Sequence, residues 1–430
     1  MVENKVTQLK QALEQRSDLI DWRFALSNSS SIKIGMEMGE IGGPYRPPVI
    51  GSGLSATLYA VWEDGTVSDA DIEPHHFSDL QGNLDEWRSQ SREDPDKARI
   101  LTPQQYLPVK IYDSEVARLL EDPSPLFGIL SLYQKALKGQ GTENIQASAS
   151  VQVGRKFLLS STGMEGFYAY TSMDTYCVLD EIHISGDSSR KIIGKSCAQK
   201  FVEQTLLWYR RSKENVEMPT GEVDVIFSSG FTGQLMGKFI VYHISGSNVA
   251  EGKSRFTRDD FVSGKQILSE KISIVHDGIK DWDNNSAPFS SEGVANSSQY
   301  LIHKGRLLQP YTGVKWADKL GFKPVGSGRM YLKVPDAAPL EEMIADTQEG
   351  VLIHGVLGLH GQNEAKGDYS VPSYLAHRIV GGKVVGSGNV SITGNVFDNF
   401  SEEQMTFTFD QLDQLEVGFK IRTNVKGLGK

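Results

Sequence analysis

Apolar and polar residues alternate in two distinct rhythms along the first sixty residues. Residues 3–16 place Val6, Leu9 and Leu13 on one face of a helix. Three later segments alternate with a period of two, which predicts strands with one buried face each: residues 20–26, 31–37 and 51–62. The N-terminal region is therefore expected to begin as a helix followed by a meander of strands.

In the middle of the chain, the spacing of apolar residues changes twice more between the helical period and the period of two. Residues 113–139 have a helical pattern that Pro123 and Pro125 interrupt. From Asn144 the period returns to two, which predicts long antiparallel strands with tight turns at Gly154 and Gly163. Residues 189–213 then predict a helix whose core face includes Ile193, Cys197 and Phe201.

A Pro-Thr-Gly turn at 219–221 marks the expected domain boundary. A strand is predicted over 222–227, a helix over 230–242, and mainly strands after residue 350. We therefore expect an α+β fold with two domains. Residues 1–217 form an N-terminal domain of mixed helices and antiparallel sheet, and residues 218–430 form a large β-rich C-terminal domain.

Charge and composition narrow the class of protein. With 44 Lys and Arg against 54 Asp and Glu, the formal net charge is −10, which argues against direct nucleic-acid binding. No apolar stretch is long enough to span a membrane, and the N-terminus lacks the apolar core of a signal peptide. Two cysteines support no disulfide framework. A reduced, cytoplasmic setting is the expectation.

The usual catalytic motifs are missing from the sequence. None of the 9 histidines is followed by Glu, so no HExxH helix exists. The stretch 246–254 has one residue too many between its glycines for a phosphate loop, and no GxSxG elbow occurs. His75 with His76, or His354 with His360, remains open as a source of metal ligands. The residues alone therefore assign no catalytic, cofactor-binding or metal site.

Several ordered blocks in the C-terminal half resemble the TldD/PmbA family. The turn at 219–222 with its strand resembles that family's P-x-G turn and V-L-F strand. Residues 286–294 resemble its PFDDEG block, with Ser290 and Ser291 in place of both acids. Further similar blocks follow in the family's order: residues 350–353, 358–360, 367–370 and 394–395.

The resemblance implies a role without catalysis in this chain. One branch of the family carries HExxxH in the helix after the V-L-F strand, where it binds zinc. The corresponding residues 228–237 contain neither His nor Glu, so the chain resembles the PmbA/TldE branch. The resemblance implies a non-catalytic subunit of a heterodimeric zinc metallopeptidase. Its expected partners are a TldD-like subunit with HExxxH, which holds the zinc, and an unfolded or leader peptide.

The resemblance also suggests residues that line a substrate chamber or subunit interface: His354, His360, Gly367, Asp368, Tyr369 and Ser370. A structural turn is the alternative for 367–370. Other hypotheses are a stand-alone homodimeric peptide-binding or regulatory protein, a modulator of DNA gyrase, and a metal enzyme using His354, His360 and Asp368. The insertion at 42–48 (GGPYRPP) suggests a divergent member of unassigned partner and substrate.

Overall fold

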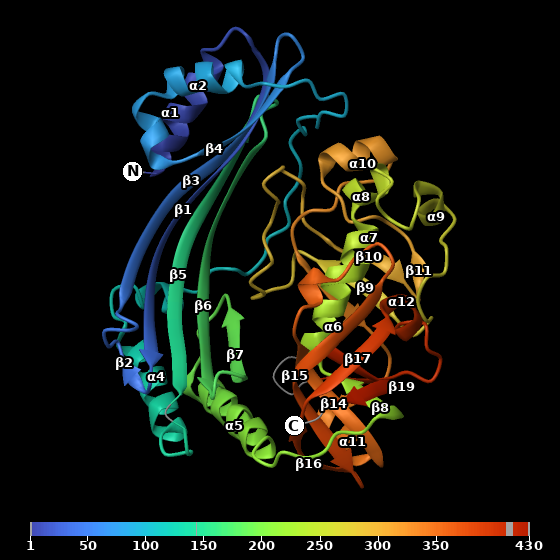
Figure 1. Cartoon of the computed structure of the whole chain (residues 1–430). Coiled ribbons are helices and arrows are strands. Elements are labelled where there is room, and N and C mark those ends of the chain that lie inside the picture. Colours follow the sequence, from blue (N-terminus) through green and yellow to red (C-terminus); the bar gives the residue numbers. More distant parts are fainter. Residues whose placement is uncertain (1, 143, 410–415, 429–430) are drawn as a thin grey trace. The chain divides into compact units, whose positions relative to one another are not determined.

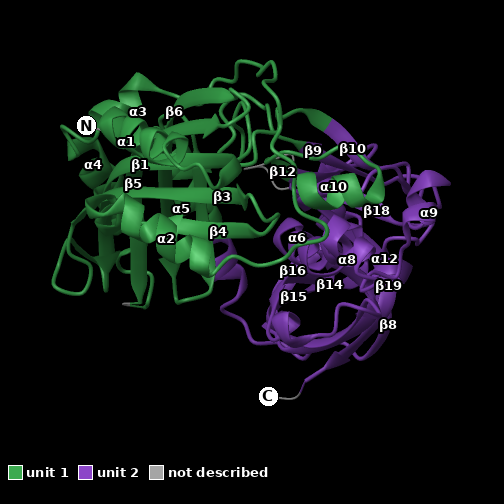
Figure 2. Cartoon of the chain, turned by 90° about the horizontal axis from the view of Figure 1, so that it is seen from above, with its two compact units in different colours: residues 1–205, 277–298, 313–329 green, residues 206–276, 299–312, 330–430 purple. Residues whose placement is uncertain are grey.

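The computed structural model describes residues 2–142, 144–409 and 416–428, drawn in Figure 1. The chain divides into two compact units, coloured separately in Figure 2. Unit 1 comprises residues 1–205, 277–298 and 313–329, and unit 2 comprises 206–276, 299–312 and 330–430. The division first falls within helix α5 (Lys195–Arg211). The domain boundary expected at 217/218 stays a prediction, because the compact units consist of several separate segments, whereas the expected domains are two continuous ones.

Helices and strands are mixed throughout, which confirms the α+β class. The remaining α-helices are α1 (Val2–Glu14), α2 (Leu80–Ser89), α3 (Ser114–Arg118), α4 (Ser124–Leu137), α6 (Ser229–Leu235), α7 (Val241–Ile244), α8 (Gly246–Ala250), α9 (Arg258–Val262), α10 (Val314–Leu320), α11 (Leu340–Ala345) and α12 (Val396–Asn399). Short 3₁₀ or π segments are η1 (Pro74–Ser78), η2 (Met236–Ile240) and η3 (Leu359–Gly361). In the described part of the chain, no helix has both the length and the apolar character that crossing a bilayer demands.

Unit 1 is built on one antiparallel sheet with the order β4-β3-β1-β5-β6-β7, with β2 attached to β1. Its strands are β1 (Leu19–Glu37), β2 (Glu40–Ile41), β3 (Val49–Trp62), β4 (Val67–Ile72), β5 (Ile145–Ser160), β6 (Glu165–Leu179) and β7 (His183–Ser189). The two strands expected at 20–26 and 31–37 are one strand, β1. The polar serines between them continue the ladder because β3 and β5 pair with β1 on both edges.

The turn predicted at Gly154 is wrong, whereas the turn at Gly163 is confirmed. Gly154 lies inside β5 opposite Tyr170 of β6, and a Cβ there would stand 2.3 Å from the Tyr170 ring. The glycine makes room for that ring across the strand pair. Gly163 has φ of 83°, a conformation that suits glycine in the turn between β5 and β6.

Two apolar clusters cover the two faces of this sheet. On one face α1 and α2 pack against Trp22, Phe24 and Leu58. The second cluster joins Tyr59, Leu158 and Met164 of the sheet region to residues from the two later segments of unit 1, namely Phe289, Val294 and Val314. Unit 1 therefore needs chain that is separated by many residues in sequence to complete its core.

The core face of α5 differs from the prediction at Cys197. Cys197 is exposed, whereas Ala198, Phe201 and Val202 are buried. The buried face is displaced by one position because Ala198, rather than Cys197, continues the i, i+3, i+4 series. Cys177 on β6 is buried as expected, and burial raises the pKa of its thiol to about 11.

Unit 2 contains a ring of five strands closed by hydrogen bonds: β8, β14, β15, β17 and β19 each pair with two neighbours in this ring. Its larger sheet consists of β8 (Gly221–Phe227), β13 (Ala338–Pro339), β14 (Glu349–Val356), β15 (Asp368–Val380), β16 (Lys383–Gly388), β17 (Val390–Asn395), β18 (Thr406–Phe409) and β19 (Val417–Gly427). A smaller sheet has the order β11-β10-β9-β12 and consists of β9 (Ser273–Asp277), β10 (Ser298–His303), β11 (Arg306–Leu307) and β12 (Arg329–Lys333). These strands confirm that the C-terminal region is rich in β-structure.

The alternation of side chains along β8 gives unit 2 two packing surfaces. Ile226 packs with Trp208, Ile344 and Leu352. Its neighbour Phe227 points the other way and stacks on Phe419 with ring centroids 4.5 Å apart. This second surface supports the helix that follows β8, where the family resemblance places the zinc-binding motif.

Candidate functional site

The candidate site begins where β8 ends and α6 starts. The Ser228 hydroxyl accepts a hydrogen bond from the Phe231 amide at 3.3 Å, which caps the helix. The same hydroxyl donates to the His354 carbonyl oxygen at 3.0 Å on the neighbouring strand β14. Phe231 is fully buried and stacks on Phe227, so the first turn of α6 is fixed to the strands beneath it.

One lysine ties this helix to the loop before β15. Residues 236–240 form the π-helical segment η2, a geometry that often marks functional positions. Lys238 in that segment makes an ion pair with Glu364, and its Nζ also donates to the His360 carbonyl oxygen at 2.8 Å. The hydrogen bond from Lys238 is the main cause that lowers the pKa of Glu364 below its usual value.

His243 at the end of the same helical stretch is held as a neutral side chain. Its Nδ1 accepts from the Arg255 amide at 3.0 Å, so Nε2 carries the proton and donates to the Glu364 carbonyl oxygen at 3.0 Å. Burial lowers the pKa of His243, which agrees with a neutral ring. With both ring nitrogens bonded to main chain, this histidine is structural.

The two predicted histidines lie in different surroundings. His354 is on β14, with its ring centroid 4.3 Å from that of Trp208 and 5.0 Å from that of His377. His377 is buried on the paired strand β15, and its Nε2 lies 2.9 Å from the Ser212 hydroxyl. His360 is exposed in η3.

The predicted segment 367–370 is divided between surface and core. Gly367 has φ of 78°, and Asp368 accepts a hydrogen bond from the Asn395 amide at 2.7 Å. Asp368 and Ser370 are exposed, whereas Tyr369 is only 2% exposed. Burial raises the pKa of Tyr369, and its hydroxyl hydrogen-bonds to Asn399. The exposed members keep the predicted chamber or interface role as a hypothesis, and Tyr369 supports the core.

The part of the chain that the structure describes does not bring together a donor set for a zinc ion. Zinc sites use three or four His, Cys, Asp or Glu side chains. Within the described residues, no group of three such side chains is placed to hold a metal. Between residues 228 and 240 the only ionisable side chain is that of Lys238, a cation.

Sequence reasoning missed one functional candidate, Arg23 on β1. Its guanidinium Nη2 lies 3.3 Å from the Glu292 carboxylate, which belongs to the block 286–294. Glu292 also accepts from the Val314 amide at 3.0 Å. The available signal was a cation between Trp22 and Phe24 in an alternating strand. Its partner, more than two hundred residues away, could not be read from the sequence.

Comparison with known proteins identifies the C-terminal region. Residues 220–414 match the PmbA/TldA metallopeptidase C-terminal domain. An uncharacterised protein of Methanocaldococcus jannaschii is 30% identical over 147 residues, 32% of this chain and 35% of the relative. A metalloprotease TldD homolog of Buchnera aphidicola from Acyrthosiphon pisum is 29% identical over 144 residues, 33% of this chain and 28% of the relative. The chain thus spans about a third of the length of these curated relatives.

Solved structures share the fold over the full length. TldE from Thermococcus kodakarensis has a TM-score of 0.81 at 17% identity, covering 99% of this chain and 100% of the other. A protein from Bacteroides thetaiotaomicron, named a putative modulator of DNA gyrase, has a TM-score of 0.78 at 17% identity, with 100% of both chains covered. The match over residues 220–414 and the shared fold confirm the resemblance to the PmbA/TldD family.

Proposed function

We propose that this chain is the non-catalytic subunit of a TldD/TldE-type heterodimeric zinc metallopeptidase. The observation that carries the proposal is the helix after β8. It follows its strand as the family's zinc helix does, yet residues 228–240 offer only Lys238 as an ionisable group. The structural likeness to TldE and the sequence likeness to TldD homologs agree with a two-subunit arrangement.

Zinc chemistry explains why a partner is required. A catalytic zinc ion lowers the pKa of its bound water to about 7 and polarises the scissile carbonyl. The cation Lys238 would repel a divalent metal, and the nearest carboxylate, Glu364, is already paired with it. We therefore assign the zinc ion and the general acid/base to the HExxxH-bearing subunit.

This chain would contribute binding surface for the peptide. An extended unfolded peptide gains main-chain hydrogen bonds when it adds to the edge of a sheet, with little selection of side chains. The exposed groups His360, Asp368 and Ser370 near the start of β15 are the candidates to border such a peptide or the partner subunit.

Co-expression with the HExxxH-bearing relative from the same genome tests the proposal. We expect a 1:1 complex by size exclusion, zinc in the partner alone, and digestion of an unfolded peptide only when both chains are present. A partner variant with the HExxxH glutamate changed to Gln is the matched control, and it should keep the complex while losing cleavage.

Two results would contradict the proposal. Stoichiometric zinc and cleavage by this chain alone would assign it a metal site of its own. A stable homodimer that binds peptide, ignores the relative and shows no cleavage would favour the stand-alone binding protein instead.

A further inference from the structure

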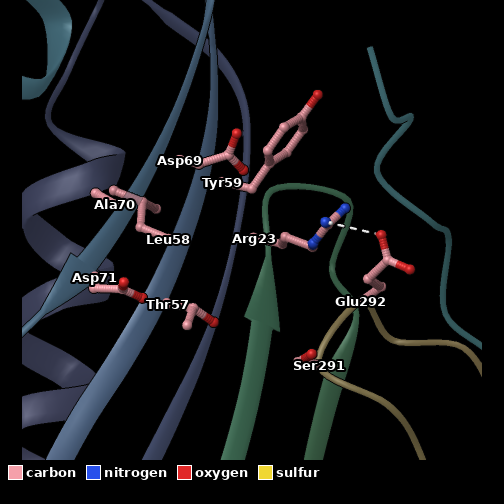
Figure 3. A pocket seen from close by; sticks show the side chains of 9 residues that line it. All are labelled: Arg23, Thr57, Leu58, Tyr59, Asp69, Ala70, Asp71, Ser291 and Glu292. Atoms are coloured by element: carbon pink, nitrogen blue, oxygen red, sulfur yellow. Dashed lines mark hydrogen bonds and ion pairs between the residues drawn. The ribbon is translucent and has the colours of Figure 1, made fainter. Parts of the chain in front are cut away.

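A pocket of about 230 Å³ opens on the sheet of unit 1 (Figure 3). The strand register explains its lining. Arg23 of β1 lies opposite Tyr59 of β3, and Tyr59 lies opposite Asp69 of β4. Thr57 and Asp71 form the next row on the same face, since alternate residues of a strand share a face. Ser291 and Glu292 border the pocket from a loop that returns to unit 1.

Arg23 has an unused hydrogen-bond donor in this pocket. The guanidinium stacks 4.6 Å from the Tyr59 ring centroid, and Nη2 contacts Glu292. Its Nη1 is buried and meets no acceptor among the residues that the structure describes. Such a charged donor is costly to leave unpaired, so it favours a ligand that brings a carbonyl or carboxylate oxygen.

The acidic residues decide which ligand fits. Glu292 is occupied by Arg23 and the Val314 amide, and Asp69 is paired with Arg92 at 2.9 Å. Asp71 is exposed, and within the described ranges no cation pairs with it. Because the remaining charge is negative, a ligand carboxylate is disfavoured. A neutral acceptor combined with a cationic group satisfies both Arg23 and Asp71.

The sheet provides a path for such a ligand. β4 is the last strand of the sheet order, and apart from the bridge between Val67 and Arg92 no described strand pairs with its outer edge. An extended peptide can therefore lie beside β4 with main-chain hydrogen bonds. The pocket is smaller than the roughly 300–1,000 Å³ of drug-sized ligand sites, which suits a single side chain.

We propose that this pocket selects a basic residue of a peptide: Arg23 donates to a peptide carbonyl, and Asp71 pairs with the ammonium group of a lysine side chain. A free amino terminus carries the same ammonium chemistry. The strands β1 and β4 are separated by two strand spacings, roughly 10 Å, and that span suits the longer lysine side chain. The proposal deepens the proposed function by naming a substrate class, and it rests on that function only for the origin of the peptide.

The test measures peptide binding to this chain alone by calorimetry. The probe is acetyl-Ala-Ala-Lys-Ala-Ala-amide, compared with the same peptide carrying norleucine in place of lysine. We expect the lysine peptide to bind at least tenfold more tightly, because the ammonium–carboxylate hydrogen bond is worth about one factor of ten or more. Asp71→Asn should remove most of this preference. Glu121→Gln, the same charge change at an exposed residue outside the pocket, should leave it intact.

Three outcomes would overturn the assignment. The first is equal affinity for the lysine and norleucine peptides, and the second is an unchanged preference for lysine in Asp71→Asn. The third is a norleucine peptide with a free amino terminus that binds more tightly than the blocked lysine peptide, which would assign the pocket to an amino terminus. Lysine-selective binding without two-chain cleavage would retain this pocket and reject the proposed function. Cleavage by the two chains together without lysine-selective binding would retain the proposed function and reject this role of the pocket.

Discussion

At the scale of single residues, Lys238 gives the helical stretch 228–240 its single positive charge. It is 18% exposed, and it joins that helix to Glu364 and to the His360 carbonyl oxygen. A hydrogen bond between two charged groups is stronger than a neutral one, although solvent reaches Glu364 and weakens the pair.

The Lys238–Glu364 pair predicts a pH-dependent contribution to stability. The pKa of Glu364 is lowered from 4.5 in the folded chain, chiefly by its bond to Lys238. The pair therefore stabilises the fold fully above the unfolded pKa, and its contribution is lost as the pH falls through the lower folded value. Glu364→Gln should cost about 0.5–1 kcal/mol near neutral pH. Denaturant titrations should show this gap closing below about pH 4.

Glu403→Gln is the control for that experiment, because Glu403 is exposed and only its main-chain oxygen is bonded to a cation, Lys271, among the described residues. A gap between wild type and Glu364→Gln that keeps its full neutral-pH size down to about pH 3 would mean that the carboxylate charge is not the source of the stabilisation.

At the scale of elements, the helix after β8 is rich in glycine without a steric need for it. A Cβ at Gly230, Gly233 or Gly237 would meet no atom within 4 Å. Gly246, at the start of α8, differs because its Cβ would stand 2.4 Å from the Thr312 side chain. Gly230, Gly233 and Gly237 can therefore accept a larger side chain, whereas close packing against Thr312 requires glycine at position 246.

Substitution by alanine tests this difference. Gly233→Ala should stabilise the chain by about 0.5–1 kcal/mol, since alanine restricts the unfolded chain and favours the helix. Gly246→Ala should destabilise it by about 1–3 kcal/mol through overpacking. Urea denaturation measures both. Destabilisation by Gly233→Ala would show that the helix needs a contact or a conformation that only glycine allows.

The elements also show what the sequence could predict. Strong periodicity located α1, α4, α5 and β8, because those patterns reflect burial of one face. It failed at Gly154, where the reason for glycine is a ring on the neighbouring strand. It also split β1 in two, because hydrogen bonds on both edges carry the strand through polar serines. For the site, the absent zinc motif was readable in residues 228–237, whereas the pocket of Arg23 depends on three strands and a distant loop.

At the scale of the whole molecule, unit 1 is discontinuous in sequence. Residues 277–298 and 313–329 belong to it, and they supply Phe289, Val294 and Val314 to the cluster around Leu158 and Met164. Each large apolar side chain that is fully buried in such a cluster contributes about 1.5–3 kcal/mol to the free energy of unfolding. Removing the later segments would uncover the sheet.

A fragment of residues 1–217 should therefore fail to fold as a native unit. It ends at the boundary predicted from sequence, but it lacks the residues that complete this core. We expect it to bind a hydrophobic dye and to lose the cooperative thermal unfolding that the full chain shows under the same conditions. A fragment with a sharp transition and no dye binding would show that the later segments are dispensable, and would support the 217/218 boundary as a folding boundary.

The same discontinuity affects how the protein is made. The long sheet leaves the ribosome first, but the last segment of unit 1 ends only at residue 329. At roughly 5–20 residues per second, the wait from residue 205 to residue 329 is on the order of ten seconds. During that time an unfinished apolar surface is open to solvent, so the nascent chain is a natural client for chaperones. A stalled ribosome in this interval would release a polypeptide prone to aggregation.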